Sequence, residues 1–438
     1  MLSRQVYFPF VPEHGQKRRR YYNSDANKLF EQDRAFHQWY RFVLSFPPHL
    51  VQEYIGKFQL CKEDVLLDPF CGTGTTLVEA KKHGLQSIGV EANKAAHFAS
   101  TVKCDWTIDI NNFVAESEQI AKLADKKIQS CKKIRILPDE QMELLLECSI
   151  SPIPLHKTLI LLEIINETQQ TQFTKHQRLA LAASTVRDAS NLHFGPEVGV
   201  TRIKKQDSDV VANWLATINM FARDLKEIST QKKKTRPEVI LGDARCLEDC
   251  LQNYEYHSVA AVFTSPPYPN EKDYTRTTRL ESVLLGFLHN KSELREMKQG
   301  LLRSNSRNIY KNDNDDHFIN NHSEVIKLAE TIESKRIAMG KTSGFEKMYH
   351  KVVLQYFGGM TRHLESLKPF LRKGAMLGYV VGDQASFLQV YIPTGKILAD
   401  IAVNLGYKLV SIDPFRTRFA TATKMKMNEE IVVLQWIP

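Results

Sequence analysis

The chain contains the stretch Leu66-Leu67-Asp68-Pro69-Phe70-Cys71-Gly72-Thr73-Gly74-Thr75-Thr76, in which a short apolar run passes into a loop with two glycines. Residues 64–68 predict a buried strand, and residues 75–83 have the apolar spacing of a helix. Residues 87–91 predict a second strand. A strand, a helix and a strand in this order form a βαβ unit, so we expect a parallel sheet with a right-handed crossover.

The loop in this unit has the features of a site for an anionic, nucleotide-like ligand. Gly72 and Gly74 let backbone N–H groups approach a ligand closely, and the N-terminus of the following helix favours negative charge. Three nearby hydroxyls would add donors: Thr73, Thr75 and Thr76. Glu91 ends the second strand, about 20 residues further on, where α/β folds place a carboxylate for ribose hydroxyls. The alternative is a pair of ordinary turn glycines with a solvated strand end.

A second motif, Thr264-Ser265-Pro266-Pro267-Tyr268, follows a strand predicted over residues 258–264. Two successive prolines fix φ and remove two N–H donors, so the loop is left to present carbonyl oxygens. The Ser265 hydroxyl and the Pro266 carbonyl are then candidate acceptors for an amino group. The Tyr268 ring suits stacking on a planar base. Out of context, the same residues predict only a proline-rich turn.

The rest of the chain alternates between strand patterns and two interruptions. Further strands are expected at residues 238–243, 375–383 and 430–435, and a helix at residues 396–405. Within residues 111–234, helical spacing occurs at 144–148, 159–165 and 214–228, with no strand pattern between them. We therefore predict a basic N-terminal arm (1–35), a catalytic core (36–110, 235–290 and 348–438), a helical insertion (111–234) and a polar insertion (291–347). Either insertion is a candidate for recognition of DNA.

Composition favours a globular protein with a polyanionic partner. The 438 residues carry a formal net charge of +9, which suits binding to nucleic-acid phosphates. The run Lys17-Arg18-Arg19-Arg20-Tyr21-Tyr22 is either an arm that contacts phosphates or a solvated end. Seven scattered cysteines, without metal-site spacing, predict free thiols and no metal. Because no apolar run reaches the roughly 18 residues of a membrane helix and no signal peptide begins the chain, we expect a cytoplasmic protein.

At its two motifs the chain resembles the S-adenosylmethionine-dependent DNA amino-methyltransferases of restriction–modification systems. The resemblance implies a Rossmann-like α/β core, with a seven-stranded sheet that has one antiparallel strand. It implies S-adenosylmethionine as the cofactor, and catalysis by Ser265, Pro266, Pro267 and Tyr268. Cofactor contacts are implied for Asp68, Pro69, Phe70, Cys71, Gly72, Thr73, Gly74, Thr75, Thr76, Glu91 and Asp243, and for Ser45 and Phe46 at the methionine end. Asp243 would accept from the adenine amino group.

The resemblance also implies double-stranded DNA as the substrate, with the target base flipped out of the helix. In having serine at position 265, the chain is similar to the family members that act on cytosine, whereas those that act on adenine usually have Asp or Asn at this position. We therefore expect a site-specific enzyme that forms N(4)-methylcytosine and has a functional link to a restriction endonuclease. Adenine N(6) methylation, RNA amino-methylation and a catalytically inactive nucleic-acid-binding protein are the alternatives. The target sequence and the oligomeric state are left open.

One feature departs from the family pattern. In the subgroup with the most similar cofactor loop, the catalytic loop usually precedes that loop, whereas here it follows. A circular permutation preserves the sheet, because chain ends usually lie close together at the surface. Residues 191–197 are either a DNA-facing loop or a turn inside the helical insertion. Residues 270–276 either hold the flipped base or the gap that it leaves, or form a polar loop that leads to a helix.

Overall fold

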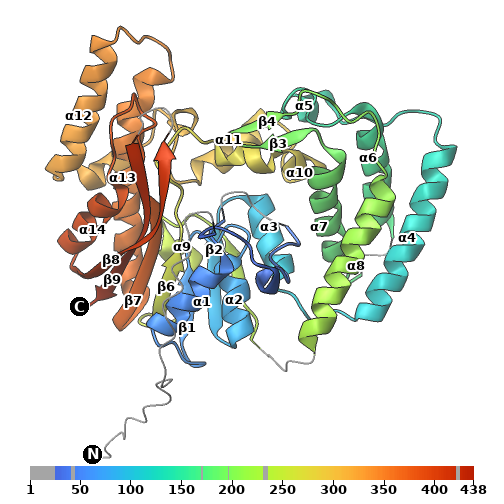
Figure 1. Ribbon diagram of the computed structural model, residues 1–438, viewed down its shortest axis with the longest axis horizontal. Coiled ribbons are helices and arrows are strands. Elements are labelled where there is room, and N and C mark those ends of the chain that lie inside the picture. Colours follow the sequence, from blue (N-terminus) through green and yellow to red (C-terminus); the bar gives the residue numbers. More distant parts are fainter. Residues whose placement is uncertain (1–24, 41–44, 169–170, 196, 230–234, 421–424) are drawn as a thin grey trace, which may run out of the picture.

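The computed structural model describes residues 25–40, 45–168, 171–195, 197–229, 235–420 and 425–438 (Figure 1). The basic run at residues 17–22 lies outside the described residues, as does most of the predicted N-terminal arm. In the described part, no helix is long and apolar enough to cross a membrane.

A seven-stranded sheet with the order β5-β2-β1-β6-β7-β9-β8 forms the centre of the fold. Its strands are β1 (Val65–Asp68), β2 (Gln86–Glu91), β5 (Glu238–Leu241), β6 (Val259–Thr264), β7 (Leu371–Gly382), β8 (Tyr407–Ala420) and β9 (Met425–Trp436). The five neighbouring strands β5, β2, β1, β6 and β7 pair in parallel. Strand β9 is antiparallel to both of its neighbours, β7 and β8. The prediction of a Rossmann-like α/β core with one antiparallel strand is confirmed.

The two sequence motifs follow neighbouring strands. β1 pairs in parallel with β6, with Leu67 opposite Val262. Both strands therefore end at the same edge of the sheet, and the loops that follow them meet there. Ligands of open parallel sheets bind outside this edge.

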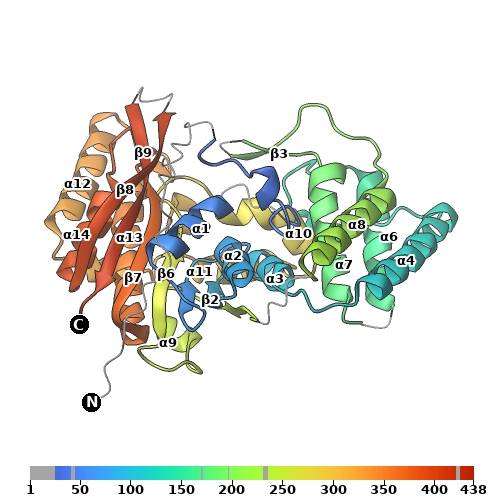
Figure 2. The same ribbon diagram turned by 60° about the horizontal axis from the view of Figure 1, so that its bottom comes forward.

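Helices cover both faces of the sheet, and the side-chain alternation of β1 shows how. Leu67 packs in a core with α9 (Leu247–Cys250), α13 (Tyr349–Leu367) and α14 (Thr394–Asn404). Its neighbour Leu66 points to the opposite face and packs with α1 (Pro48–Lys57) and α2 (Thr75–His83). Helix α3 (Lys94–Lys103) follows β2 on the same face as α2 (Figure 2).

A helical lobe occupies the region between α3 and β5, on the right of Figure 1. It contains α4 (Ile110–Ser130), α5 (Asp139–Met142), α6 (Pro152–Glu167), α7 (Thr174–Ser184) and α8 (Val210–Ser229). Two features differ from prediction. The helix expected at residues 144–148 is absent, because Leu144 packs from a turn after the short α5. A hairpin of β3 (Leu192–Phe194) and β4 (Val198–Val200) was not expected, since three-residue strands are too short to show alternation.

The helical lobe shares its hydrophobic core with the sheet domain. One cluster contains Val78 of α2, Val102 of α3 and Trp214 of α8. Trp39 joins the same cluster, stacks on Phe221 with ring centroids 4.1 Å apart, and donates its indole N–H to Asp224 at 2.8 Å. The lobe is therefore held to the core by continuous packing.

The region between β6 and β7 is not a plain polar loop. It contains α10 (Arg279–Leu284), α11 (Lys291–Gln299) and α12 (Ser323–Ala338), of which α12 packs along α13 (Figure 1). Short 3-10 segments are η1 (Glu31–Asp33), η3 (Tyr274–Thr278), η4 (Ser306–Asn308), η5 (Asp315–Ile319), η6 (Glu346–Met348) and η7 (Lys368–Phe370), and η2 (Thr185–Ala189) is a π-helical turn.

Candidate active site

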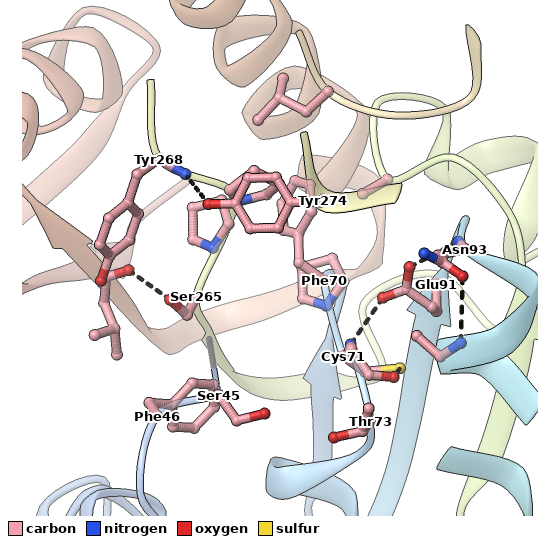
Figure 3. A pocket seen from close by; sticks show the side chains of 18 of the residues that line it. Ser45, Phe46, Phe70, Cys71, Thr73, Glu91, Asn93, Ser265, Tyr268 and Tyr274 are labelled. Carbon is pink, nitrogen blue, oxygen red and sulfur yellow. Dashed lines mark hydrogen bonds between the residues drawn. The ribbon is translucent and has the colours of Figure 1, made fainter. Parts of the chain in front are cut away.

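A cavity of about 290 Å³ opens at the carboxyl ends of β1, β2, β5 and β6 (Figure 3). The structure brings most of the sequence-predicted residues to its wall. These are Ser45, Phe46, Pro69, Phe70, Cys71, Gly72, Thr73, Thr75, Glu91, Asp243, Ser265, Pro266, Pro267 and Tyr268. It does not place Asp68, Gly74 and Thr76 on this wall. Residues of both motifs therefore line one cavity.

The loop between β1 and α2 has a backbone that only glycine adopts easily. Gly72 and Gly74 have φ angles of +52° and +81°. A side chain at position 74 would bring its Cβ within 2.5 Å of Ser100 Oγ in α3. At position 72 a Cβ would meet nothing within 4 Å. The first glycine thus leaves open space beside the backbone, and the second allows the loop to lie against α3.

Glu91 lies at the end of β2 and is fixed by backbone donors (Figure 3). Its Oε2 accepts the N–H of Gly72 at 2.8 Å, and its Oε1 accepts the N–H of Asn93 at 2.7 Å. Burial raises the pKa of Glu91 to about 7, although the two N–H bonds oppose this rise. The carboxylate is therefore a half-buried acceptor that further donors would stabilise in its ionised form.

Asp68 connects the two motifs from beneath the cavity. It is fully buried and accepts hydrogen bonds from Thr264 Oγ1 at 2.6 Å and from the Phe70 N–H at 3.2 Å. Thr76 donates to the Phe263 carbonyl at 3.2 Å, which joins α2 to β6. Burial raises the pKa of Asp68 to about 6. These contacts give Asp68 and Thr76 a positioning role: they fix the first loop relative to the second.

Asp243 lies after β5 and belongs to a buried ion network. Both of its carboxylate oxygens accept from the guanidinium of Arg245, which is only 6% exposed. Arg245 also binds the carboxylate of Asp315 and the carbonyl of Gln299. The segment that follows Gln299 contributes Leu302 to the cavity wall. The network therefore anchors part of the region between β6 and β7 at the cavity.

The loop after β6 presents its polar atoms to the cavity. Ser265 donates its hydroxyl proton to the Val380 carbonyl at 3.1 Å, which leaves the lone pairs of Oγ to accept. The backbone N–H of Tyr268 donates to the Tyr274 hydroxyl at 3.0 Å (Figure 3). The Tyr268 ring lies over Gly382, where a Cβ would approach Cε2 within 3.0 Å. The serine and the tyrosine are thus held by β7 and by the segment that follows the loop.

Several wall residues were not assigned to the site from the sequence: Asn93, Leu301, Leu302, Phe415, Arg416, Arg418 and Glu429. Asn93 caps α3, and its signal was its place two residues after Glu91. The pair Leu301-Leu302 stood out as apolar within a polar region. The last four come from the β8–β9 hairpin, which shows a register shift between Pro414 and Arg416. Proline inside a strand pattern is typical of such irregular sites.

Comparison with known proteins finds similarity to DNA methyltransferases. The sequence profile of a family described as DNA methylase matches residues 12–101. Over 94% of its length the chain is 26% identical to the type II methyltransferase M.BsoBI of Geobacillus stearothermophilus, covering 86% of that protein. It is 23% identical to M.AvaI of Nostoc sp. strain PCC 7120 (86% of this chain, 80% of that one) and 22% identical to M.MvaI of Kocuria varians (83% and 80%). The resemblance to DNA amino-methyltransferases of restriction–modification systems is confirmed.

Proposed function

We propose that this chain, similar in sequence to type II DNA methyltransferases, methylates the N4 amino group of cytosine at a specific site in duplex DNA. S-adenosylmethionine is the proposed methyl donor. The observation that supports this most is the meeting of two loops in one cavity. The loop with Gly72 follows β1, the loop with Ser265 follows β6, and the two strands are neighbours.

The first loop fits the cofactor. Gly72 has no atom near the position of a Cβ, so a ligand can approach the loop backbone closely there, although the N–H of Gly72 itself donates to Glu91. The N-terminus of α2 begins at Thr75 and favours negative charge. Glu91, with a pKa raised to about 7 by burial, is placed to accept from ribose hydroxyls. Phe70 would pack against the adenine ring, and Asp243, fixed by Arg245, would accept from its amino group.

The second loop fits an exocyclic amine. The amino nitrogen of cytosine is a poor nucleophile because its lone pair is delocalised into the ring. Ser265 Oγ and the Pro266 carbonyl would accept hydrogen bonds from the amino hydrogens and draw the lone pair out of the ring plane. The bond from Ser265 to the Val380 carbonyl orients the lone pairs of Oγ for this task. S-adenosylmethionine would supply the electrophilic methyl group and leave as S-adenosylhomocysteine, and the proton released from the methylated nitrogen would pass to solvent.

Duplex DNA fits the charge and the depth of the site. A formal net charge of +9 favours a polyanion. The Ser265 loop lies inside a cavity, so a base must leave the helix to reach it. The half-buried ring of Tyr268 would stack on the flipped base and offset the loss of stacking in the duplex.

A transfer assay tests the proposed substrate class. The purified protein is incubated with methyl-labelled S-adenosylmethionine and either unmodified duplex DNA, single-stranded DNA or tRNA. We expect label in duplex DNA. Label in tRNA, with none in duplex DNA, would contradict the proposal. We further propose that methylation protects host DNA from a partner endonuclease, which predicts that DNA from expressing cells resists a nuclease of the same specificity.

A further inference from the structure

The β8–β9 hairpin brings an ion cluster to the wall of the proposed base pocket. Glu429 of β9 is only 5% exposed, and it binds Nε of Arg416 and, at 2.8 Å, Nε of Arg418, both on β8. All three residues line the same cavity as Ser265. Burying a carboxylate between two guanidinium groups costs desolvation energy, which close pairing of the three groups offsets.

The cluster lies beside the proposed stacking ring. Gly382 of β7 pairs with Glu429 of β9 in the sheet. A Cβ on Gly382 would come within 2.9 Å of Glu429 Cγ and within 3.0 Å of Tyr268 Cε2. The carboxylate and the ring therefore both pack over this glycine. This contact places the cluster at the level of the base that Tyr268 would stack on.

The two arginines differ in what remains free for a ligand. Arg418 also donates from Nη2 to the Asp383 carbonyl at 3.1 Å, so it contributes to the hairpin itself. Arg416 is held through Nε, and its two terminal nitrogens form no hydrogen bond with another acceptor among the described residues. Its side chain is 23% exposed and lines the cavity. With its Nε fixed by Glu429, Arg416 thus presents the N–H donors of its two terminal nitrogens to the cavity.

We propose that Arg416 reads the edge of the flipped cytosine, as a specificity-determining residue oriented by Glu429. The inference rests on the proposed function. Next to its amino group, cytosine has two adjacent acceptors, N3 and O2, which match the two N–H donors of a guanidinium fork. Adenine has only one acceptor, N1, next to its amino group, followed by a C–H. A bidentate contact therefore favours cytosine over adenine.

The charge of the cluster favours a base over a backbone phosphate. A site for a phosphate gains from uncompensated positive charge, whereas Glu429 neutralises one of the two guanidinium groups. A neutral base edge needs fixed donor directions, and an almost fully buried carboxylate supplies them. Lysine at position 416 would keep the charge and lose the fork.

The test begins with DNA from cells that express the protein, in which sequencing of modified bases locates the methylated site. Synthetic duplexes of this site then carry cytosine, adenine or an abasic nucleotide at the target position. The transfer rate constant kcat/KM is measured for cytosine and adenine, and the Kd is measured for the cytosine and abasic duplexes with S-adenosylhomocysteine present. The variants are Arg416→Lys and Arg416→Gln. The matched control is Arg372→Lys. Arg372 is also ion-paired, but it lies at the start of β7, whereas the cluster packs at Gly382 at the end of that strand.

We expect Arg416→Lys to lower kcat/KM on cytosine by about 10- to 100-fold. Transfer to adenine and the Kd for the abasic duplex should stay within about twofold of wild type, as should all values of the control. Two results would overturn the inference and indicate a phosphate contact. One is an equal loss of kcat/KM on cytosine and on adenine; the other is a loss of affinity for the abasic duplex equal to that for the cytosine duplex. Unchanged kcat/KM on cytosine would overturn it too.

Two controls separate this result from other failures. Binding of S-adenosylhomocysteine reports whether each variant is folded, and Arg416→Gln should show the same selective loss if Arg416→Lys folds poorly. If the located site carries methyladenine, or no modified base is found, the proposed function itself is wrong. That result appears with the wild-type protein before any variant is made.

Discussion

The backbone N–H of Gly72 donates to Oε2 of Glu91 at 2.8 Å, so the loop after β1 and the end of β2 are joined directly at the cavity. The contact fixes the carboxylate and holds the glycine loop in place at once. Since burial raises the pKa of Glu91 to about 7, its charge changes near neutral pH.

The affinity for the cofactor should therefore depend on pH. Ribose hydroxyls favour the ionised carboxylate, so binding below pH 7 must release a proton from Glu91. We expect the affinity for S-adenosylhomocysteine to fall by about tenfold from pH 8 to pH 6. Glu91→Gln should bind at least about tenfold more weakly at pH 8, because its amide NH₂ faces an N–H donor, and should lose this pH dependence. Calorimetric titrations of both proteins make the comparison; the same affinity of wild type at both pH values would contradict it.

The fit of the loop against α3 is tested by alanine at two glycines. Gly74 and Gly84 both have positive φ, at +81° and +73°, but only Gly74 has a neighbour, Ser100, in the way of a Cβ. Both changes strain the backbone by about 1–2 kcal/mol. Gly74→Ala should lower the free energy of unfolding further and also weaken cofactor binding. Chemical denaturation and ligand titration measure this. An equal effect of the two substitutions on both quantities would show that the contact with α3 is unimportant.

The ion network around Arg245 should stabilise the fold, so removing one of its charges should destabilise the protein. Asp315 is 2% exposed and binds Arg245 and Arg362. Asp315→Asn removes the second carboxylate partner of the buried Arg245 and the carboxylate partner of Arg362, and should lower the free energy of unfolding by about 3 kcal/mol. Cofactor affinity should fall as well, because Arg245 holds Asp243. The control is Glu143→Gln, which breaks an exposed pair with Lys291 of α11 and should change neither quantity.

The role of Ser265 separates turnover from binding. Ser265→Ala removes a hydroxyl that would contact the amino group and leaves the first loop intact. We expect kcat to fall by about 100-fold or more, with the Kd for S-adenosylhomocysteine unchanged within error. Single-turnover kinetics and titration measure the two quantities. Normal turnover would remove Ser265 from the chemistry, and a matching loss of cofactor affinity would indicate a structural role.

The sequence was sufficient for the parts of the fold with strong local patterns. The helix expected at residues 75–83 matches α2, and β1 and β2 begin within one residue of expectation, because buried strands and paired glycines are distinctive. β8 was missed: its register shifts near Pro414, and charged residues interrupt its apolar pattern. The β3–β4 hairpin was missed because its strands are short. Local periodicity does not predict such strands, because their formation depends on their neighbours in the sheet.

For the site, the sequence located both loops but not the full wall. Leu302 and Arg416 reach the cavity from regions far from either motif, and only the tertiary fold brings them there. Conversely, Asp68 belongs to the first motif yet lies beneath the cavity, bonded to Thr264. A motif indicates which residues act together and does not distinguish those that touch a ligand from those that position the loop. The reversed order of the two motifs is compatible with the sheet, since β1 and β6 are neighbours.

The most direct test of the account is the identity of the methylated nucleoside. Duplex DNA that contains the site is incubated with wild-type protein and S-adenosylmethionine, digested to nucleosides and analysed by mass spectrometry, with Ser265→Ala treated in parallel. The account predicts N(4)-methylcytosine with the wild type and a strongly reduced amount with the variant. N(6)-methyladenine would contradict the assignment of the base, and the absence of any methylated nucleoside would contradict the proposed function.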